Sequence, residues 1–223
     1  MGEQPVPALK AEPATEQASP ARAALSELGR AGRTLPFWVL FGTFFICGWS
    51  TNGLIQTHFV PAAHDHGMPM DTAAGLLALV GVFDIVGTIC SGWLSDRIDA
   101  RLLLFVYYGL RGLALLVGPS VMSDSVDMPL MFFVVFYGLD WVATVPPTVA
   151  LCRQQFGVAR SSVVFGWVFA GHMVGAGVAA GLAGMIRERT GSYDDAWFLA
   201  GGLCVVAALA IFVIRAPQVT KTA

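Results

Sequence analysis

One short charged segment between two long apolar stretches constrains this chain most. Residues 92–101 read GWLSDRIDAR. Asp84 is the single charge in residues 72–95, and Arg111 is the single charge in residues 102–122. A transmembrane helix needs about 20 consecutive, mostly apolar residues. Both stretches are therefore predicted to cross a membrane, and the charged segment is predicted to be the tight turn between them.

The composition agrees with a membrane protein. Of the 223 residues, 56% are hydrophobic and 13% are charged, and the mean hydropathy is +0.67, too apolar for a soluble domain. The net charge of -2 and the lack of a dense basic cluster give no reason to expect a nucleic-acid partner. Cys47, Cys90, Cys152 and Cys204 fall one to each of four apolar stretches, without metal-ligand spacing. We therefore expect reduced cysteines, no metal site and no cofactor.

Six apolar stretches are long enough for transmembrane helices. They are residues 36–60, 72–95, 102–122, 130–152, 163–186 and 196–214. The loops between them are short, so consecutive helices should lie antiparallel as neighbours. The predicted fold class is an all-α membrane protein whose six transmembrane helices form one domain over residues 36–215.

The two ends of the chain are polar. Residues 1–35 are rich in Pro, Ala, Glu and Gln and are predicted to be a disordered cytosolic tail, and residues 216–223 a cytosolic C-terminal tail. Within the first tail, residues 21–33 carry Leu25 and Leu28 among arginines. This segment is interpreted as a flexible linker, and a short amphipathic helix on the membrane surface is the alternative.

Basic residues predict the orientation. Most of the 13 lysines and arginines lie in the two tails and in the turns at residues 95–101 and 153–162, whereas Arg187 and Arg189 lie on the opposite side. Basic residues are enriched on the cytoplasmic side of membranes. We therefore expect an integral protein of the cell (inner) membrane with both termini in the cytosol.

The charged segment also resembles a family motif. The motif residues are Gly92, Leu94, Ser95, Asp96, Arg97 and Arg101. Their order is similar to the signature loop of the major facilitator superfamily of secondary transporters, which joins helices two and three and, in a weaker copy, helices eight and nine. The family usually has a glycine at Asp99 and a basic residue at Ala100. The resemblance implies a gating loop in which Gly92, Asp96, Arg97 and Arg101 form a cytosolic charge clamp.

Two further features choose between the family halves. The polar segment before the first helix looks like the family's central linker, and TGSY at residues 190–193 resembles the connection between helices eleven and twelve. The resemblance therefore implies the C-terminal six-helix half of a major facilitator fold. A missing N-terminal six-helix half or a second copy is then the expected partner, besides the lipid bilayer.

Four ionisable residues lie deep in the predicted helices: Asp84, Arg111, Asp140 and His172. At 1.5 Å per residue, each is roughly 14 to 18 Å from the nearer helix end, close to the bilayer midplane. Such residues are costly there and mark a substrate pathway or an ion pair.

The fourth helix carries a polar stripe. Tyr137, Asp140, Trp141, Thr144 and Thr148 share one helical face. The stripe is predicted to be hydrated, and Asp140 is predicted to be the acid whose charge matters for transport.

The first helix repeats this pattern with Asn52 and Gln56. The family resemblance would place these residues and His172 around a central cavity. The alternative is that Asn52, Gln56 and the hydroxyls only bond neighbouring helices, and that Tyr137 and Trp141 only fill space.

Arg111 is interpreted differently. In the family the third helix of each half lies at the periphery, so an ion pair of Arg111 with Asp84 or Asp140 is favoured over contact with an anionic substrate. Asp84, one helix away with apolar neighbours, is the expected partner. His172 is interpreted as a neutral hydrogen-bonding residue, and a proton-carrying histidine is the alternative.

The acid of the second helix and the segments YGLRG and YGLDW look similar to the monocarboxylate transporter branch and its bacterial relatives. That branch often has an arginine four residues after the acid, where this chain has Thr88. The resemblance implies transport of a small organic anion, a monocarboxylate, with protons. The alternatives are a non-transporting six-helix remnant or accessory subunit and, more weakly, an intramembrane enzyme, for which no Gly-x-Ser-Gly element accompanies His172.

Overall fold

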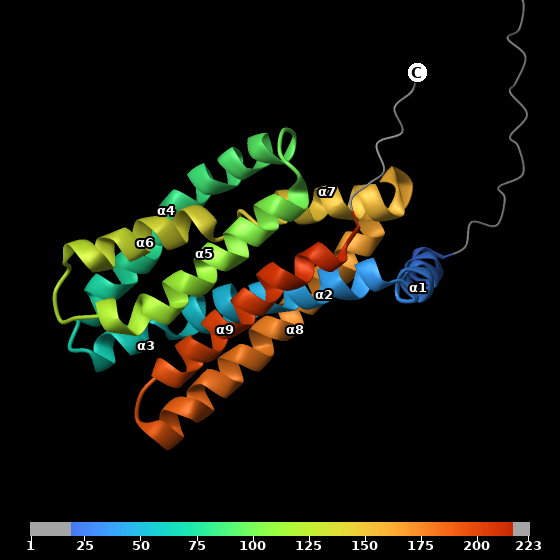
Figure 1. Cartoon of the computed structure of the whole chain (residues 1–223). Helices are drawn as coiled ribbons and strands as arrows, with labels where there is room; N and C mark the ends of the chain where they lie inside the picture. The colour runs from blue at the N-terminus through green and yellow to red at the C-terminus, as the bar shows by residue number, and fades with distance from the viewer. Residues whose placement is uncertain (1–18, 216–223) are drawn as a thin grey trace, which may run out of the picture.

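The structure, a computed structural model, describes residues 19–215 and contains six helices long and apolar enough to cross a membrane (Figure 1). These are Leu35–Asp65, Met70–Ser95, Ala100–Val121, Met128–Phe156, Val158–Thr190 and Asp194–Val213. The predicted all-α fold with six transmembrane helices is confirmed. Residues 1–18 and the predicted tail at 216–223 lie outside the described residues.

Two of the six helices are irregular. The first consists of α2 (Leu35–Gly48), a π-helical segment η1 (Trp49–Ile55) and α3 (Gln56–Asp65), and the fourth is divided into α6 (Met128–Asp140) and α7 (Val145–Phe156). The others are α4 (Met70–Ser95), α5 (Ala100–Val121), α8 (Val158–Thr190) and α9 (Asp194–Ala210), which ends in the 3₁₀ turn η2 (Ile211–Val213). A helix α1 (Pro20–Ala31) precedes them.

Several helices extend beyond the apolar stretches, because a polar segment next to the apolar layer can continue the helix. The clearest case is α8, which is longer than the apolar residues 163–186. It lies between Gly157 and Gly191, whose φ angles of 81° and 83° are accessible mainly to glycine. These glycines, and not the apolar pattern, determine where α8 begins and ends.

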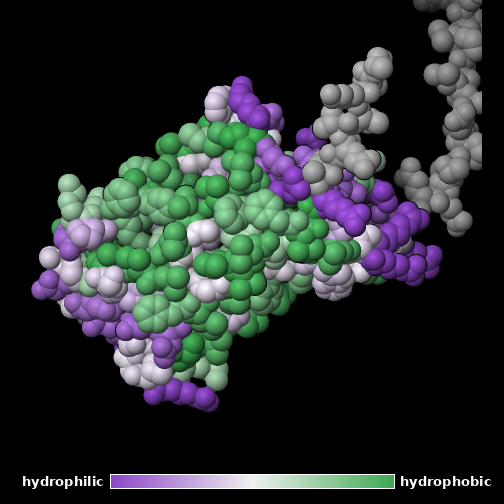
Figure 2. Space-filling view, in the orientation of Figure 1, coloured by the Kyte–Doolittle hydropathy of each residue, from purple (hydrophilic) through white to green (hydrophobic). Residues whose placement is uncertain are grey.

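Consecutive helices run antiparallel. In Figure 1, α1, the α4–α5 turn and the α7–α8 turn lie at the right-hand end of the bundle, and the other turns lie at the opposite end. The main neighbour pairs are α5 with α9, α2 with α8 and α4 with α6. Figure 2 shows a hydrophobic band across the middle of the molecule with hydrophilic residues at both ends, as expected for a chain that spans a bilayer.

The core consists of two buried apolar clusters. One includes Phe59, Tyr137 and Trp197, and the other, nearer α1, includes Phe44 and Leu151. The buried residues Arg111 of α5, Asp140 of α6 and His172 of α8 lie along their helices between these two clusters. The bundle therefore has a polar layer at mid-depth.

Glycines allow the backbones of α2 and α8 to approach closely. A Cβ at Gly48 would overlap the backbone carbonyl of His172, and one at Gly175 would overlap the carbonyl of Phe45. By contrast, Gly177 and Gly181 have no atom within 4 Å of a Cβ position. Gly48 and Gly175 therefore form a close contact between α2 and α8, of the kind that small residues allow between helices in membranes.

The linker interpretation is wrong for α1. Its N-terminus is capped by Ser19, whose Oγ accepts a hydrogen bond of 3.4 Å from the Arg22 amide. The indole of Trp167 in α8 donates to the Ala24 carbonyl at 3.1 Å, and Ala31 is buried. A helix forms here because capping and packing on α8 add to a sequence that alternates apolar and basic faces.

Gly48→Ala should lower the free energy of unfolding by about 1–3 kcal/mol, because the added methyl group would overlap the His172 backbone. Gly177→Ala is the matched control: its position is open, and the higher helix propensity of alanine should leave stability unchanged or slightly raised. Thermal unfolding of the detergent-purified variants measures both effects. Equal unfolding midpoints for the two variants would contradict the assigned helix crossing.

Candidate functional site

The fourth transmembrane helix is interrupted at mid-depth. Between α6 and α7, residues 141–144 form a turn, and Pro146 and Pro147 occupy the first turn of α7. Proline has no amide hydrogen, so both residues leave carbonyl groups of the preceding turn without their helical donors. Backbone groups in a membrane must find other partners.

Neighbouring helices supply those partners. Pro147 leaves the Ala143 carbonyl without its helical donor, and Ser91 of α4 donates to this carbonyl at 2.5 Å. The turn at residues 141–144 leaves the carbonyls of Asp140 and Trp141 without helical donors, and Arg111 of α5 donates to them at 2.6 and 3.0 Å. The Asp84 carboxylate of α4 also accepts a hydrogen bond from the Val142 amide at 3.0 Å. Side chains of α4 and α5 thus hold the helix interruption.

Arg111 is the centre of this network. Its side chain is fully buried, with 0% exposure, and its Nε lies 2.5 Å from Asp140 Oδ2. A third nitrogen donates to Cys47 Sγ at 3.2 Å, and Cys47 shares a hydrogen bond with Thr144. All three nitrogens of the guanidinium are therefore used inside this six-helix unit.

The expected Asp84–Arg111 pair is wrong: Arg111 pairs with Asp140. The physical reason is the helix interruption, which places the Asp140 carboxylate beside two carbonyls without helical donors, so that one guanidinium bonds all three groups. Asp140, for which a hydrated site is predicted, is only 4% exposed. Its Oδ1 atom has no hydrogen-bond partner among residues 19–215.

Asp84 instead borders a cavity of about 410 Å³ on the surface of α4. The other polar lining residues are Gln56 of α3 and Trp141 of the helix interruption, and the rest of the wall is Ala, Leu, Val and Gly. Asp84 Oδ1 accepts from Thr88 Oγ1 at 3.1 Å as well as from the Val142 amide, and no described residue bonds Oδ2. The described lining includes no basic side chain.

The other predicted site residues point into the protein. The Tyr137 hydroxyl donates to the Ser50 carbonyl at 2.8 Å, and Thr144 and Thr148 are buried. The stripe therefore faces the bundle interior, and of its residues only Trp141 borders the Asp84 cavity. Periodicity identified the face correctly but could not tell a packed interior from water.

His172 and Asn52 contact each other away from this cavity. His172 Nε2 lies 3.2 Å from Asn52 Oδ1, and the Phe169 ring stacks on the imidazole at 5.4 Å between centroids. Asn52 is part of the π-helical segment η1. This pair joins the first and fifth transmembrane helices.

The charged segment at residues 92–101, which contains the turn between α4 and α5, has an internal ion pair. Arg101 bonds both oxygens of Asp99, with the shortest contact at 2.5 Å, and Asp99 Oδ1 also accepts from the Arg101 amide. Hydrogen bonds from the Arg101 side chain hold the pKa of Asp99 below its usual range. Arg97 stacks on the Trp93 ring at 4.1 Å, while Asp96 has no ion-pair partner in the described part of the chain. The predicted clamp of Asp96 with Arg97 and Arg101 does not form within this half, and Gly92 has open space around it.

Sequence reasoning missed Cys47 as a member of the polar network. Its thiol lies at the level of Arg111 because α2 and the interrupted helix meet there. The sequence position of Cys47 could have indicated this role, since Cys47 lies at a depth in the first helix similar to that of the four ionisable residues.

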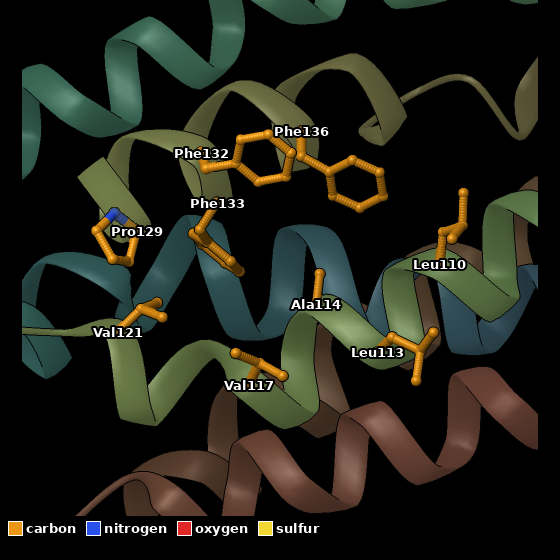
Figure 3. A pocket seen from close by; sticks show the side chains of 9 residues that line it. All are labelled: Leu110, Leu113, Ala114, Val117, Val121, Pro129, Phe132, Phe133 and Phe136. Atoms are coloured by element: carbon orange, nitrogen blue, oxygen red, sulfur yellow. The ribbon is translucent and has the colours of Figure 1, made fainter.

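A second cavity, of about 420 Å³, lies between α5 and α6 and is entirely apolar. Figure 3 shows side chains of both helices around it, among them Leu113, Val117, Phe132 and Phe136. Binding sites for small polar molecules need a few polar groups to orient the ligand. The Asp84 cavity has such groups and this one does not, so the Asp84 cavity is the candidate site.

The family model of the Major Facilitator Superfamily matches residues 37–223. The chain belongs to this superfamily. It is 27% identical over 171 residues to the uncharacterized MFS-type transporter YcxA of Bacillus subtilis, covering 75% of this chain and 40% of YcxA. It is 29% identical over 180 residues to monocarboxylate transporter 12-B of Danio rerio, covering 79% of this chain and 37% of that protein.

Solved structures show the same fold. A variant of the fucose:proton symporter FucP of E. coli aligns with a TM-score of 0.68 at 16% identity, covering 89% of this chain and 48% of FucP. The chain spans about half the length of this structure and 40% or less of these two relatives. It therefore corresponds to one six-helix half of a major facilitator fold.

Removing either member of the Arg111–Asp140 pair should destabilise the protein by about 3–5 kcal/mol, because the remaining charge stays buried without a partner. Arg111→Gln should cost more than Asp140→Asn, since it also removes the donors to two carbonyls. The double variant should recover part of the loss of Arg111→Gln. Unfolding midpoints in detergent measure these differences.

Asp84→Asn is the control for this series. The amide oxygen of asparagine can still accept from the Val142 amide, so the cost should be about 1 kcal/mol or less. If Asp140→Asn unfolds at the wild-type midpoint while Asp84→Asn does not, the assignment of the ion pair is wrong.

Proposed function

We propose that this protein is the C-terminal half of a secondary transporter that moves a small organic anion, a monocarboxylate, together with a proton. The observation that carries the proposal is the Asp84 carboxylate in the wall of a polar cavity beside Gln56 and Trp141. The names of similar proteins support it, since several are monocarboxylate transporters and FucP is a fucose:proton symporter.

Electrostatics connects the anion with the proton. An ionised Asp84 would repel a carboxylate in a cavity whose described lining has no basic group. Protonation of Asp84 removes this repulsion and adds a hydrogen-bond donor beside the Gln56 amide and the Trp141 indole. Arg111 cannot balance the substrate charge because it is buried on Asp140. The proton itself therefore balances the charge of the substrate.

The same carboxylate connects the cavity with the helix interruption. Asp84 Oδ1 accepts from the Val142 amide, which lies between α6 and α7. Hydrogen bonds to an ionised carboxylate are stronger than those to a neutral acid. Loss of the charge on Asp84 therefore weakens one support of the interruption, so that proton and substrate binding change the balance between conformations of α7.

A second six-helix half would complete the transport path. The cavity is bounded on α4 by Ala74, Ala78 and Gly81, which are exposed, and Gly177 and Gly181 of α8 are exposed as well. Small exposed residues allow close approach of other transmembrane helices. We propose that the second half packs on these faces, supplied by a longer form of this chain or by a second copy.

The orientation follows from charge. We propose that α1 and the α4–α5 turn lie in the cytosol and that the α3–α4 turn lies outside, in a cell (inner) membrane, because arginines concentrate at the end of the bundle that holds α1. A reporter enzyme that is active only outside the cytosol should work when inserted at Gly67 and fail when fused after Ala223. The reverse pattern would show that the orientation is wrong.

Asp84→Asn should abolish accumulation of a monocarboxylate driven by a pH gradient, because asparagine cannot carry a proton, whereas exchange of substrate across the membrane should persist. The measurement is uptake of radiolabelled lactate into proteoliposomes containing the protein purified with any polypeptide that stays bound. Asp71→Asn, an exposed position on the same helix, is the matched control and should keep pH-driven uptake.

Two outcomes would contradict the proposal. Unchanged pH-driven uptake by Asp84→Asn would exclude this residue as the proton site. No uptake of any tested organic anion by the wild-type protein at any pH gradient would favour the non-transporting subunit.

A further inference from the structure

A smaller cavity, of about 330 Å³, lies at the end of the bundle where α1 joins α2. Its wall comes from α1, the starts of α2 and α8, and α7, and its charged members are Arg30, Arg160 and Glu27. Pro36 and Phe156 provide apolar wall on the side of the bundle. The cavity is separate from the Asp84 site, and the transport mechanism does not use it.

The charges in this cavity do not balance. Glu27 pairs with Arg30 at 3.2 Å and lies 4.0 Å from Arg160, so one carboxylate faces two guanidinium groups. The arginine side chains are 69% and 50% exposed, whereas that of Glu27 is only 16% exposed. Each guanidinium has five N–H donors in a fork that fits phosphate oxygens. The cavity therefore has donors and positive charge left for an anion.

Exposed apolar side chains lie on the two helices, α1 and α2, that meet at this basic site. Leu25 of α1 is 60% exposed, and Leu35 and Trp38 at the start of α2 are exposed as well. The Trp38 indole donates to the Gly32 carbonyl at 2.7 Å, which holds the ring beside the α1–α2 connection. Figure 1 shows α1 nearly end-on while the long helices are seen from the side, so the axis of α1 runs across the axes of the long helices. Exposed leucine and tryptophan near arginines at the end of a transmembrane bundle are typical of the membrane interface.

We propose that this cavity binds the phosphate of an anionic phospholipid headgroup between Arg30 and Arg160, with the acyl chains along Leu35 and Trp38. The exposed apolar side chains favour a lipid over a soluble phosphate, because only a lipid covers both the two arginines and the exposed Leu35 and Trp38 side chains. Binding replaces Glu27 as the main partner of the two arginines. The bound lipid holds α1 against α7 and α8 at the membrane surface.

The test is native mass spectrometry of the whole purified chain, titrated with phosphatidylglycerol or with phosphatidylcholine of the same acyl chains. Wild-type protein should retain phosphatidylglycerol in preference to phosphatidylcholine. The variant Arg30→Gln/Arg160→Gln should bind phosphatidylglycerol about tenfold more weakly or worse, with phosphatidylcholine binding unchanged. Glu27→Gln should bind phosphatidylglycerol more tightly than the wild type, since it removes the competing carboxylate.

Arg153→Gln is the matched control. Arg153 is an exposed arginine of α7 that does not line the cavity, so this variant loses one charge from the same region and should bind phosphatidylglycerol within about twofold of the wild type. Thermal unfolding verifies that each variant is folded. Should the double variant not fold, Arg30→Gln alone, at a largely exposed side chain, decides together with Glu27→Gln.

Three results would overturn the proposal. The first is that Arg153→Gln weakens phosphatidylglycerol binding as much as the cavity variants do, which would show general attraction by positive charge. The second is that Glu27→Gln does not strengthen binding. The third is that inorganic phosphate displaces phosphatidylglycerol at equal concentration, which would show a site for soluble anions and not for a lipid.

Discussion

The fold depends on how one buried arginine satisfies an interrupted helix. Pro146 and Pro147 prevent the fourth transmembrane helix from continuing through the bilayer as a regular α-helix. In hydrocarbon, the carbonyls without helical donors would each cost several kcal/mol. Arg111 brings three nitrogens to the Asp140 carboxylate, two carbonyls and the Cys47 thiol, and Ser91 covers a further carbonyl. The charge of Arg111 is tolerated at this depth because all three guanidinium nitrogens donate to acceptors and one of these acceptors is a carboxylate.

This network also explains why Asp84 remains available. With Arg111 bound to Asp140, the second acid of the membrane layer has only neutral partners, the Val142 amide and the Thr88 hydroxyl. Its side chain borders the cavity with Gln56 and Trp141. The two acids therefore have different roles: one completes the core, and the other faces the space where a second half and a substrate are proposed to bind.

Helix packing depends on a different constraint. Between lipid-embedded helices there is no hydrophobic driving force, so close contact has to come from small residues. Gly48 and Gly175 provide it between α2 and α8, and Gly87 provides it between α4 and Leu139. Other glycines of α8, such as Gly177, face away from the bundle and have no atom within 4 Å of a Cβ position. Sequence spacing alone did not distinguish the two kinds of glycine.

The sequence by itself determined the number of transmembrane helices, their antiparallel order and the superfamily, because each depends on local composition or on a contiguous motif such as residues 92–101. It also identified all four ionisable residues of the membrane layer. Only the tertiary structure decided which of them pair. Asp84 and Asp140 are both one helix from Arg111 in sequence, and the choice between them depends on the direction of the Arg111 side chain and on the carbonyls at the interrupted helix. The helix α1 was likewise decided by packing on Trp167, a contact across more than 140 residues of sequence.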